Sequence, residues 1–303
     1  MIVRPKENWF RLLFVWNGSV LPSIIPQLIF MAVVSSLAVL THGRVLGEKI
    51  PLNTAPFTLF GVALAIFLAF RNNASYERFN EARHLWGSLL IASRALTSEL
   101  LCYVPERADT LRIAQRLIGF VYALKHELRG SDPTEDFQRL LGPQETELLR
   151  DHCYKPVAIL NEIRRDVASP CQRVHTSDTK LWMLNTEINE LGKVVGGCER
   201  IASTPIPFAY NVLLHRTVYA YCVLLPFGLV DSTEFFTPLL CVFISYTLIA
   251  LEAIASEVAE PFSTAPNALA LDAMSRNIER SILELCGCPV PAPVAPVRPY
   301  QLS

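Results

Sequence analysis

The feature that most constrains this chain is the stretch 21–40, which contains no charged side chain. About 20 consecutive apolar residues allow an α-helix to cross the hydrocarbon core of a bilayer. Further apolar runs lie at 57–70, 206–230 and 235–251. We therefore expect an all-α membrane protein with four transmembrane helices. The run 57–70 reaches only ~21 Å as a helix, so we expect other helices to shield it from lipid.

Composition supports a membrane protein. Hydrophobic residues make up 51% of the chain and charged residues 18%, and the mean hydropathy is +0.31. Soluble domains are usually less apolar than this. The net charge of -1 argues against a nucleic-acid partner, because such a partner requires a basic face. The cysteines show no metal-ligand or disulfide spacing, so we interpret most of them as buried small side chains.

The middle of the chain, residues 71–205, predicts a large helical cytosolic domain. Charges are frequent there, and apolar residues recur at helical spacing. Helix-breaking sequences at Pro105, 130–133, 142–143 and 169–170 divide the region into four or five helices. The two clearest apolar stripes contain Leu85, Leu89, Leu96 and Leu100, and Ile113, Leu117, Phe120, Val121 and Leu124.

The two ends of the chain differ from the membrane runs. Residues 1–20 mix Trp and Phe with Arg and Lys, which predicts an amphipathic segment at the membrane surface rather than a cleaved signal peptide. Residues 252–285 predict a cytosolic helical region, and the Pro-rich tail 286–303 should be extended. The tail is either free or a strap over a neighbouring subunit. The distribution of Lys and Arg places both termini and the middle domain in the cytoplasm.

Three residues at i, i+4 and i+8 share one face of the helix predicted at 57–70: Val62, Ile66 and Phe70. In a single helix such a stripe indicates core packing. If several copies of the helix surrounded an axis, the same residues would form stacked apolar rings, which gate a pore by excluding water. The residues by themselves leave both interpretations open.

A charged segment follows this run directly. One interpretation pairs Arg78 with Glu81 on a solvated helix face. The other places a wet vestibule below the apolar stripe. The candidate vestibule or structural residues are Arg71, Asn72, Ser75, Tyr76 and Glu81.

Two other function classes deserve comparison. Glu81 and His84 form one E-x-x-H, but di-iron bundles need a second copy and two more carboxylates, and no second copy occurs. No G-x-S-x-G, H-E-x-x-H or P-loop is present either. We therefore do not expect an enzyme, and a membrane-bound metalloenzyme is the weakest alternative. A non-conducting membrane scaffold is the stronger one.

Three segments together resemble one family. FRNNASYERFNEARHLWG at 70–87 is similar to the bestrophin signature, and GGCERIASTPIPFAY at 196–210 is similar to the family's entry into its third membrane helix. EVAEPF at 257–262, followed by Asn267, stands where the family has an acidic loop. IVRPKENWF at 2–10 and ALKHELR at 123–129 extend the likeness. The chain resembles the bacterial branch of the bestrophins over nearly all its length except the tail.

The resemblance implies a homopentameric ion channel in the bacterial inner membrane, with one pore on the five-fold axis. It implies that the positions matching Val62, Ile66 and Phe70 line the neck of that pore. Counting back from the Cys198 motif, a second, cytosolic aperture falls at Thr179, where relatives carry a larger aliphatic residue. The permeating ions should be small and monovalent. Asp178 near the lower exit would favour cations, whereas Arg71 and the nearby amides would favour anions. The resemblance to the bacterial branch inclines the expectation to cations.

The acidic loop departs from the family pattern. In animal bestrophins this loop helps to form a calcium clasp, since Ca²⁺ needs several oxygen ligands. Here Ala259 stands where the first acid of the pattern falls, and Ser263 replaces a glycine. Glu257, Glu260 and Asn267 remain, which is too few for a cage. We therefore predict a degenerate calcium site and no metal or other cofactor.

Overall fold

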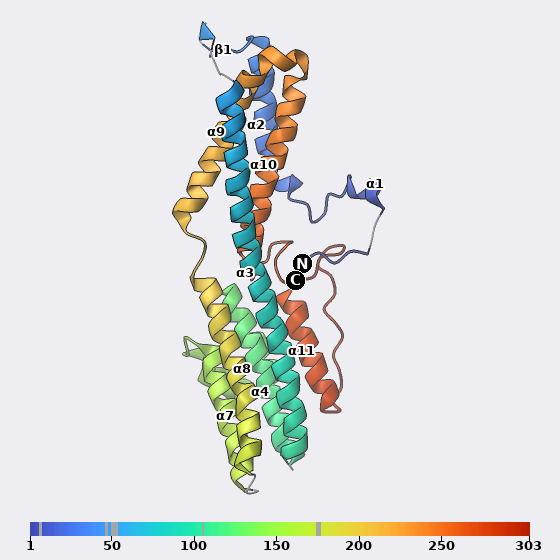
Figure 1. Ribbon diagram of the computed structural model, residues 1–303. Coiled ribbons are helices and arrows are strands. Elements are labelled where there is room, and N and C mark those ends of the chain that lie inside the picture. Colours follow the sequence, from blue (N-terminus) through green and yellow to red (C-terminus); the bar gives the residue numbers. More distant parts are fainter. Residues whose placement is uncertain (6–7, 46–47, 50–53, 105, 174–176) are drawn as a thin grey trace. The chain divides into compact units, whose positions relative to one another are not determined.

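A computed structural model describes the chain except residues 6–7, 46–47, 50–53, 105 and 174–176. It contains two compact units, which are described separately. The apolar unit comprises Pro5–Phe79 and Pro205–Glu260, and the charged unit comprises Met1–Arg4, Asn80–Thr204 and Pro261–Ser303. One helix, α3, contributes residues to both units (Figure 1).

The described elements are almost all helices. One exception is a two-residue antiparallel pairing of β1 with β2, which the apolar pattern did not predict. The elements are α1 (Trp9–Leu12), α2 (Leu21–Leu40), β1 (Arg44–Val45), β2 (Glu48–Lys49), α3 (Thr54–Tyr103), α4 (Arg107–Arg129), α5 (Thr134–Leu140), α6 (Pro143–Arg150), α7 (Lys155–Arg173), α8 (Asp178–Ser203), α9 (Phe208–Thr233), the 3₁₀ turn η1 (Glu234–Phe236), α10 (Thr237–Ala259) and α11 (Leu271–Leu285).

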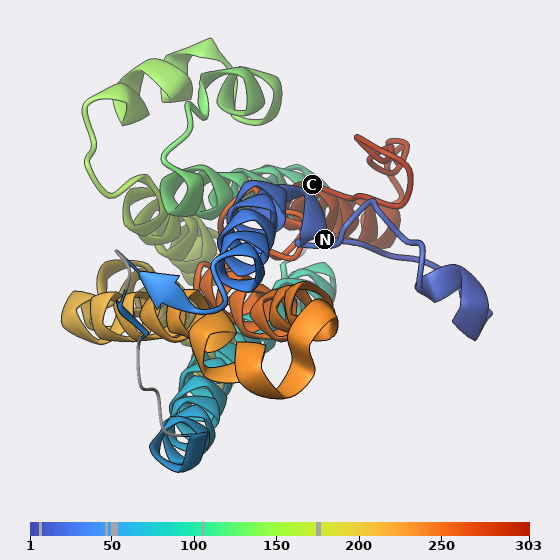
Figure 2. The same cartoon turned by 90° about the horizontal axis from the view of Figure 1, so that it is seen from above.

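In the apolar unit, α10 packs along α2 and α9, as Figures 1 and 2 show. The first part of α3 joins this group through Leu64 and Leu68, which are buried with residues of α2, α9 and α10. Three stretches of described helix are long and apolar enough to cross a membrane. They are Leu21–Leu40, Phe57–Tyr103 and Phe208–Ala259, the last of which contains α9, η1 and α10.

Several helix ends differ from the predicted ones. The prediction that Pro170 ends a helix is wrong, because α7 continues to Arg173. Proline removes one backbone hydrogen bond, and the packing of α7 against α4 and α8 sustains the helix through that loss. Pro26 and Pro226 likewise lie inside α2 and α9.

The apolar unit extends beyond the predicted limits of the apolar runs. Its first segment continues to Phe79 rather than ending at residue 70, and α10 continues to Ala259 rather than residue 251. These extensions pack together through polar contacts, such as the hydrogen bond from Arg78 Nε to the Ala259 carbonyl at 3.1 Å. A run defined by hydropathy stops at the first charge, whereas a packed helix continues as long as its charges find partners.

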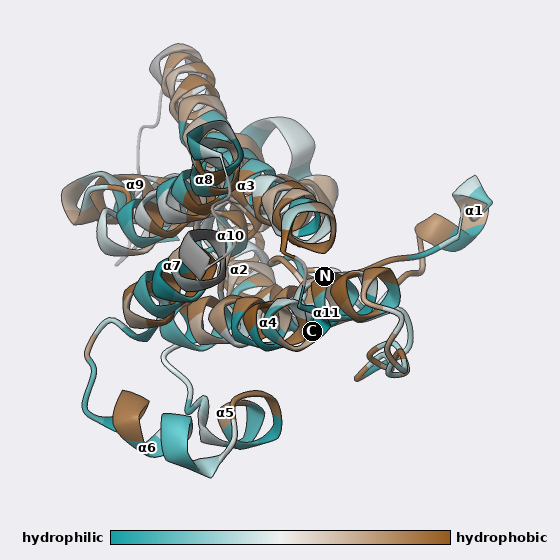
Figure 3. Cartoon of the chain, turned by 90° about the horizontal axis from the view of Figure 1, so that it is seen from below, coloured by the Kyte–Doolittle hydropathy of each residue, from teal (hydrophilic) through white to brown (hydrophobic). Residues whose placement is uncertain are grey.

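The core of the charged unit includes buried leucines of the second part of α3 and of α4, and α4 packs against α7 and α11. The stripes predicted from spacing are buried except for Leu85, which is half-buried. Leu89, Leu96 and Leu100 are 0% exposed on α3, and Leu117 is 0% exposed on α4. Figure 3 shows hydrophilic and hydrophobic residues alternating along α4, α7 and α8, as in amphipathic helices. Gly130 ends α4 with a φ of 59°, in the left-handed region that favours glycine.

Buried ion pairs attach α11 to α4 and α5. Glu279 of α11 is 1% exposed and accepts hydrogen bonds from Tyr122 of α4 at 2.6 Å and Arg139 of α5 at 2.5 Å. Burial, together with this carboxylate, raises the pKa of Tyr122. Nearer the end of α4 and the start of α11, Arg129 contacts Asp272 at 2.5 Å. These contacts fix the C-terminal helix within the charged unit.

The Pro-rich tail is extended after α11, as predicted, and it returns to the start of its own chain. Gln301 pairs with Ile2, and the Leu302 amide donates to the Met1 carbonyl at 2.9 Å. The helical region predicted at 252–285 is divided, because its first residues belong to α10 and only 271–285 form α11.

Two carboxylates meet where α8 passes α4. Glu127 Oε2 and Glu199 Oε1 are buried and have no hydrogen-bond donor within the described part of the chain. Burial, followed by the neighbouring Glu199, raises the pKa of Glu127 to about 7, and Lys155 opposes this shift. Two acceptors that face each other without a donor are satisfied when one of them holds a proton.

We expect Glu127→Gln to stabilise the charged unit above neutral pH. The folded unit holds this proton more tightly than the unfolded chain, so stability falls as pH rises from about 4.5 to about 7 and then levels off. Removing the repulsion should gain on the order of 1–2 kcal/mol at pH 8 after allowance for solvent screening. Thermal unfolding at pH 5 and pH 8 measures the difference. Glu135→Gln, at an exposed position on α5, is the control. An equal effect of Glu127→Gln at both pH values would contradict the proton-sharing interpretation.

Candidate functional site

The predicted stripe lies on an exposed face of α3. Val62 is 55% exposed, Ile66 50% and Phe70 62%. The opposite face of the same helix is buried and carries Leu64 and Leu68. Core packing within one chain therefore does not account for the stripe. Its side chains are available to a pore, to lipid or to another copy of the chain.

Behind the stripe, α3 approaches α9 closely at a glycine. A Cβ built on Gly61 would lie 2.6 Å from the hydroxyl oxygen of Tyr221. The Tyr221 ring also stacks on Phe57 at 4.7 Å between centroids. Beside this contact is a cavity of about 400 Å³ whose lining includes Val62 of the stripe and Leu225 of α9. The glycine thus lets an aromatic pair hold the first turns of α3 against α9.

The buried face of α3 continues from apolar residues into a charge. Arg71 follows Phe70 directly and is only 4% exposed. Its Nη2 donates to Ser256 Oγ of α10 at 2.8 Å, and its Nη1 lies 3.5 Å from Glu252 Oε1. The same carboxylate oxygen is 2.7 Å from Nδ1 of His215 on α9. Three helices therefore meet at one carboxylate.

Glu252 is the residue that the sequence interpretation missed. The fourth apolar run was ended at residue 251, which left this glutamate outside it, whereas Glu252 is a 7% exposed member of α10. A signal was available, because an ionisable residue in an apolar helix is expensive unless it has a partner. The same argument applies to His215 inside α9, and its partner is this glutamate.

The remaining vestibule candidates do not form one group. Ser75 is completely buried, Asn72 is half-buried, and Tyr76 is 59% exposed. Glu81 is exposed and forms an ion pair with Arg200 of α8, so it links two helices of the charged unit. The carboxylate on which both the Arg78 pairing and the E-x-x-H depended thus has a partner on another helix.

The predicted aperture residue is at the start of α8. Thr179 is the second residue of that helix and is exposed, as is Asp178 before it. Lys180 lies over the ring of Tyr103 at 5.3 Å, whereas Asp178 forms no hydrogen bond or ion pair within the described part of the chain. The start of α8 therefore exposes both a carboxylate, Asp178, and an ammonium group, Lys180, and of the two only Lys180 contacts an aromatic ring.

The residues of the predicted clasp loop are divided between the two units. Glu257 lies in the last turn of α10, and the Glu260 amide donates to the Glu257 carbonyl at 3.3 Å. Both belong to the apolar unit, whereas Asn267 belongs to the charged unit. Among the described residues, no group of three His, Cys, Asp or Glu side chains is arranged to hold a metal ion.

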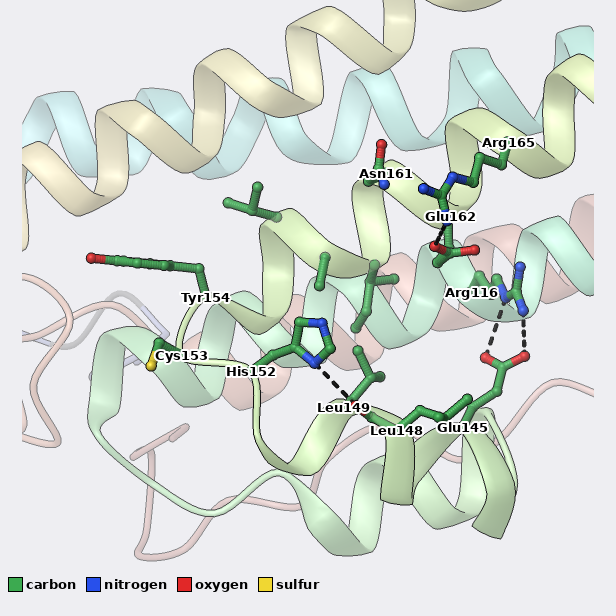
Figure 4. Close-up of a pocket in the computed structure, with 13 residues that line it drawn as sticks. Arg116, Glu145, Leu148, Leu149, His152, Cys153, Tyr154, Asn161, Glu162 and Arg165 are labelled. Carbon is green, nitrogen blue, oxygen red and sulfur yellow. Dashed lines mark hydrogen bonds and ion pairs between the residues drawn. The ribbon is translucent and has the colours of Figure 1, made fainter.

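A larger cavity, of about 760 Å³, lies in the charged unit away from every predicted site residue (Figure 4). Its charged groups are paired with one another. Arg116 contacts Glu145 at 2.5 Å and also binds Asp166, and Arg165 contacts Glu162 at 2.8 Å. The rest of the lining is mainly apolar, and no unpaired charge identifies a ligand.

Comparisons with known proteins agree with the resemblance. A family model described as bacterial/fungal bestrophin protein matches residues 1–284. The chain is 42% identical to a voltage-dependent anion channel-forming protein of Ralstonia nicotianae, and the match covers 100% of both chains. It is 41% identical to a protein of the same description from Escherichia coli K12, again over 100% of each.

A solved structure gives the same result for the fold. The crystal structure of a bacterial bestrophin homologue from Klebsiella pneumoniae is 42% identical in sequence, with a TM-score of 0.84. The match covers 88% of this chain and 99% of that one. The chain therefore belongs to the bacterial and fungal branch of the bestrophin family.

Proposed function

We propose that this protein is an ion channel of the bacterial inner membrane, with Val62, Ile66 and Phe70 as the neck of its pore. The observation that carries the proposal is the exposed apolar stripe on α3, opposite a buried face, in a chain whose relatives are named channel-forming. Apolar side chains that their own subunit does not cover are expected to contact lipid, a pore or other subunits. Copies of α3 around an axis would provide one, with apolar rings that gate by dewetting.

The proposed assembly is a homopentamer with four membrane helices per subunit, α2, the first part of α3, α9 and α10. Both termini and the charged unit would lie in the cytoplasm. In this arrangement the permeating ions are small and monovalent, and Thr179 and Asp178 border a second aperture. The exposed aspartate, together with the branch of the family, favours cations, whereas the relatives are named for anions.

We expect Ile66→Ala and Phe70→Ala to increase ion flux several-fold, because a wider and less apolar neck is easier to wet. Flux from liposomes containing the purified protein measures this. Phe67→Ala is a matched control, since Phe67 is also exposed on α3, at 52%, but lies outside the stripe. Unchanged flux in both neck variants, with the oligomer intact by size-exclusion chromatography, would favour the non-conducting scaffold.

We expect reversal potentials in planar bilayers under asymmetric salt to shift toward the cation equilibrium potential. Asp178→Asn should reduce that shift, because it removes the exposed negative charge at the aperture. Glu147→Gln removes an exposed charge from α6 and should leave the potential unchanged. A shift toward the anion potential in the wild type would instead agree with the names of the relatives.

We expect currents to be the same in millimolar Ca²⁺ and in a calcium chelator. Glu257, Glu260 and Asn267 offer too few carboxylates for a Ca²⁺ cage, which takes 6–8 oxygen ligands. Current recordings with solution exchange on the cytoplasmic side test this. A reversible, calcium-dependent current that Glu260→Gln abolishes would overturn the prediction of a degenerate site.

A further inference from the structure

One carboxylate, that of Glu252, connects three helices of the apolar unit. It contacts α3 at Arg71, the residue that directly follows the stripe. Glu252 Oε1 on α10 lies 2.7 Å from His215 Nδ1 on α9 and 3.5 Å from Arg71 Nη1 on α3. Ser256, one turn along α10, accepts a hydrogen bond from Arg71 at 2.8 Å. We call Arg71, His215, Glu252 and Ser256 the Glu252 cluster.

The two charged groups of the cluster are buried, so each needs a partner of opposite charge. Arg71 and Glu252 are 4% and 7% exposed. Within the described part of the chain, Glu252 is the anion that balances Arg71, and Arg71 Nε has no hydrogen-bond acceptor. Removing one member of such a pair leaves a buried charge uncompensated, which is strongly destabilising.

Arg71, the member of the cluster on α3, lies on the face of that helix opposite the stripe. With 3.6 residues per turn, Arg71 and Ser75 continue the buried face of Leu64 and Leu68, roughly 150° from the centre of the stripe. Arg78, seven residues after Arg71 and therefore on the same face, donates to the Ala259 carbonyl of α10 at 3.1 Å. Leucines slide past one another at little cost, whereas an arginine bound to a carboxylate fixes the rotation of its helix.

We propose that Arg71, Glu252 and His215 are positioning residues that set the rotation of α3 and thereby the direction in which Val62, Ile66 and Phe70 point. Glu252 supplies the charge that holds Arg71, and His215 holds the carboxylate from α9. The effect on helix rotation follows from the geometry of one subunit. Its effect on conduction rests on the proposed function.

Site-specific labelling measures the rotation without reference to conduction. Cysteines placed singly at Ile66 and at Phe67 report on two faces of α3. Their rates of reaction with a water-soluble maleimide in proteoliposomes are read from the corresponding peptides by mass spectrometry, so that native cysteines do not interfere. Glu252→Gln and Arg71→Gln should each change the ratio of the two rates by about tenfold, equivalent to 1.4 kcal/mol.

A double-mutant cycle on Arg71 and Glu252 distinguishes a positioning role of this pair from a general destabilisation of the apolar unit. The double variant Arg71→Gln with Glu252→Gln should resemble either single variant, and the exchange Arg71→Glu with Glu252→Arg should restore much of the wild-type ratio. Glu77→Gln is the matched control, because it removes an exposed charge from α3 outside the cluster. Additive effects, or failure of the exchange to restore the ratio, would overturn the proposal.

A milder variant covers the case in which the charge variants do not fold. His215→Leu removes a contact to Glu252 from a side chain that is 58% exposed, and it should shift the ratio in the same direction by a smaller factor. An unchanged ratio in this variant and in Glu252→Asp, with an intact oligomer, would contradict the proposal.

Flux measured on the same proteoliposomes separates this proposal from the proposed function. If the wild type conducts ions, and flux in the cluster variants changes together with the labelling ratio, both proposals are supported. A shifted ratio in a protein that conducts no ions retains the positioning role and rejects the channel. Normal flux with an unchanged ratio in every cluster variant rejects the positioning role alone.

Discussion

A buried arginine requires a carboxylate, and in this protein that requirement joins the end of an apolar stripe to two neighbouring helices. Arg71 contacts Glu252, which also binds His215. The cost of burying either charge alone makes the contact specific in a way that leucine packing is not. In the positioning role proposed above, this contact sets the direction in which the exposed apolar face of α3 points.

The same principle recurs in the charged unit. Glu279 is almost completely buried and is bound by Tyr122 and Arg139, so that helices from distant parts of the sequence meet at one carboxylate. The contact of Glu127 with Glu199 is the opposite case, since two acids meet without a cation and one of them keeps its proton up to neutral pH. Paired charges thus hold this unit together, and the unpaired acids give it a dependence on pH.

The exposed apolar face of α3 indicates that a single chain leaves surface that needs contact with lipid or with another protein. Val62, Ile66 and Phe70 are each at least half exposed, although the helix that bears them is buried on its other side. Exposed apolar surface of this kind marks contact with lipid or with other proteins. Membership of the bestrophin family gives that surface a function to be tested, as the neck of an ion channel.

Spacing and hydropathy alone determined much of this protein. The uncharged run 21–40 predicted α2 at its observed bounds, and the stripe at residues 62, 66 and 70 was placed on one face of α3. The buried stripes of the charged unit, including Leu89 and Leu117, followed from helical periodicity. Such patterns depend on neighbours along the chain, which a sequence displays directly.

Only the tertiary structure decided how the charges are paired. Arg71 follows an apolar run and looks like the start of a solvated helix, yet it is buried because Glu252, far away in sequence, lies beside it. Glu81 forms an ion pair with Arg200 of α8, which is 119 residues away along the chain. Pro170 was expected to end a helix that packing sustains to Arg173. Partners of this kind are brought together by folding, and their distance along the chain hides them from any local pattern.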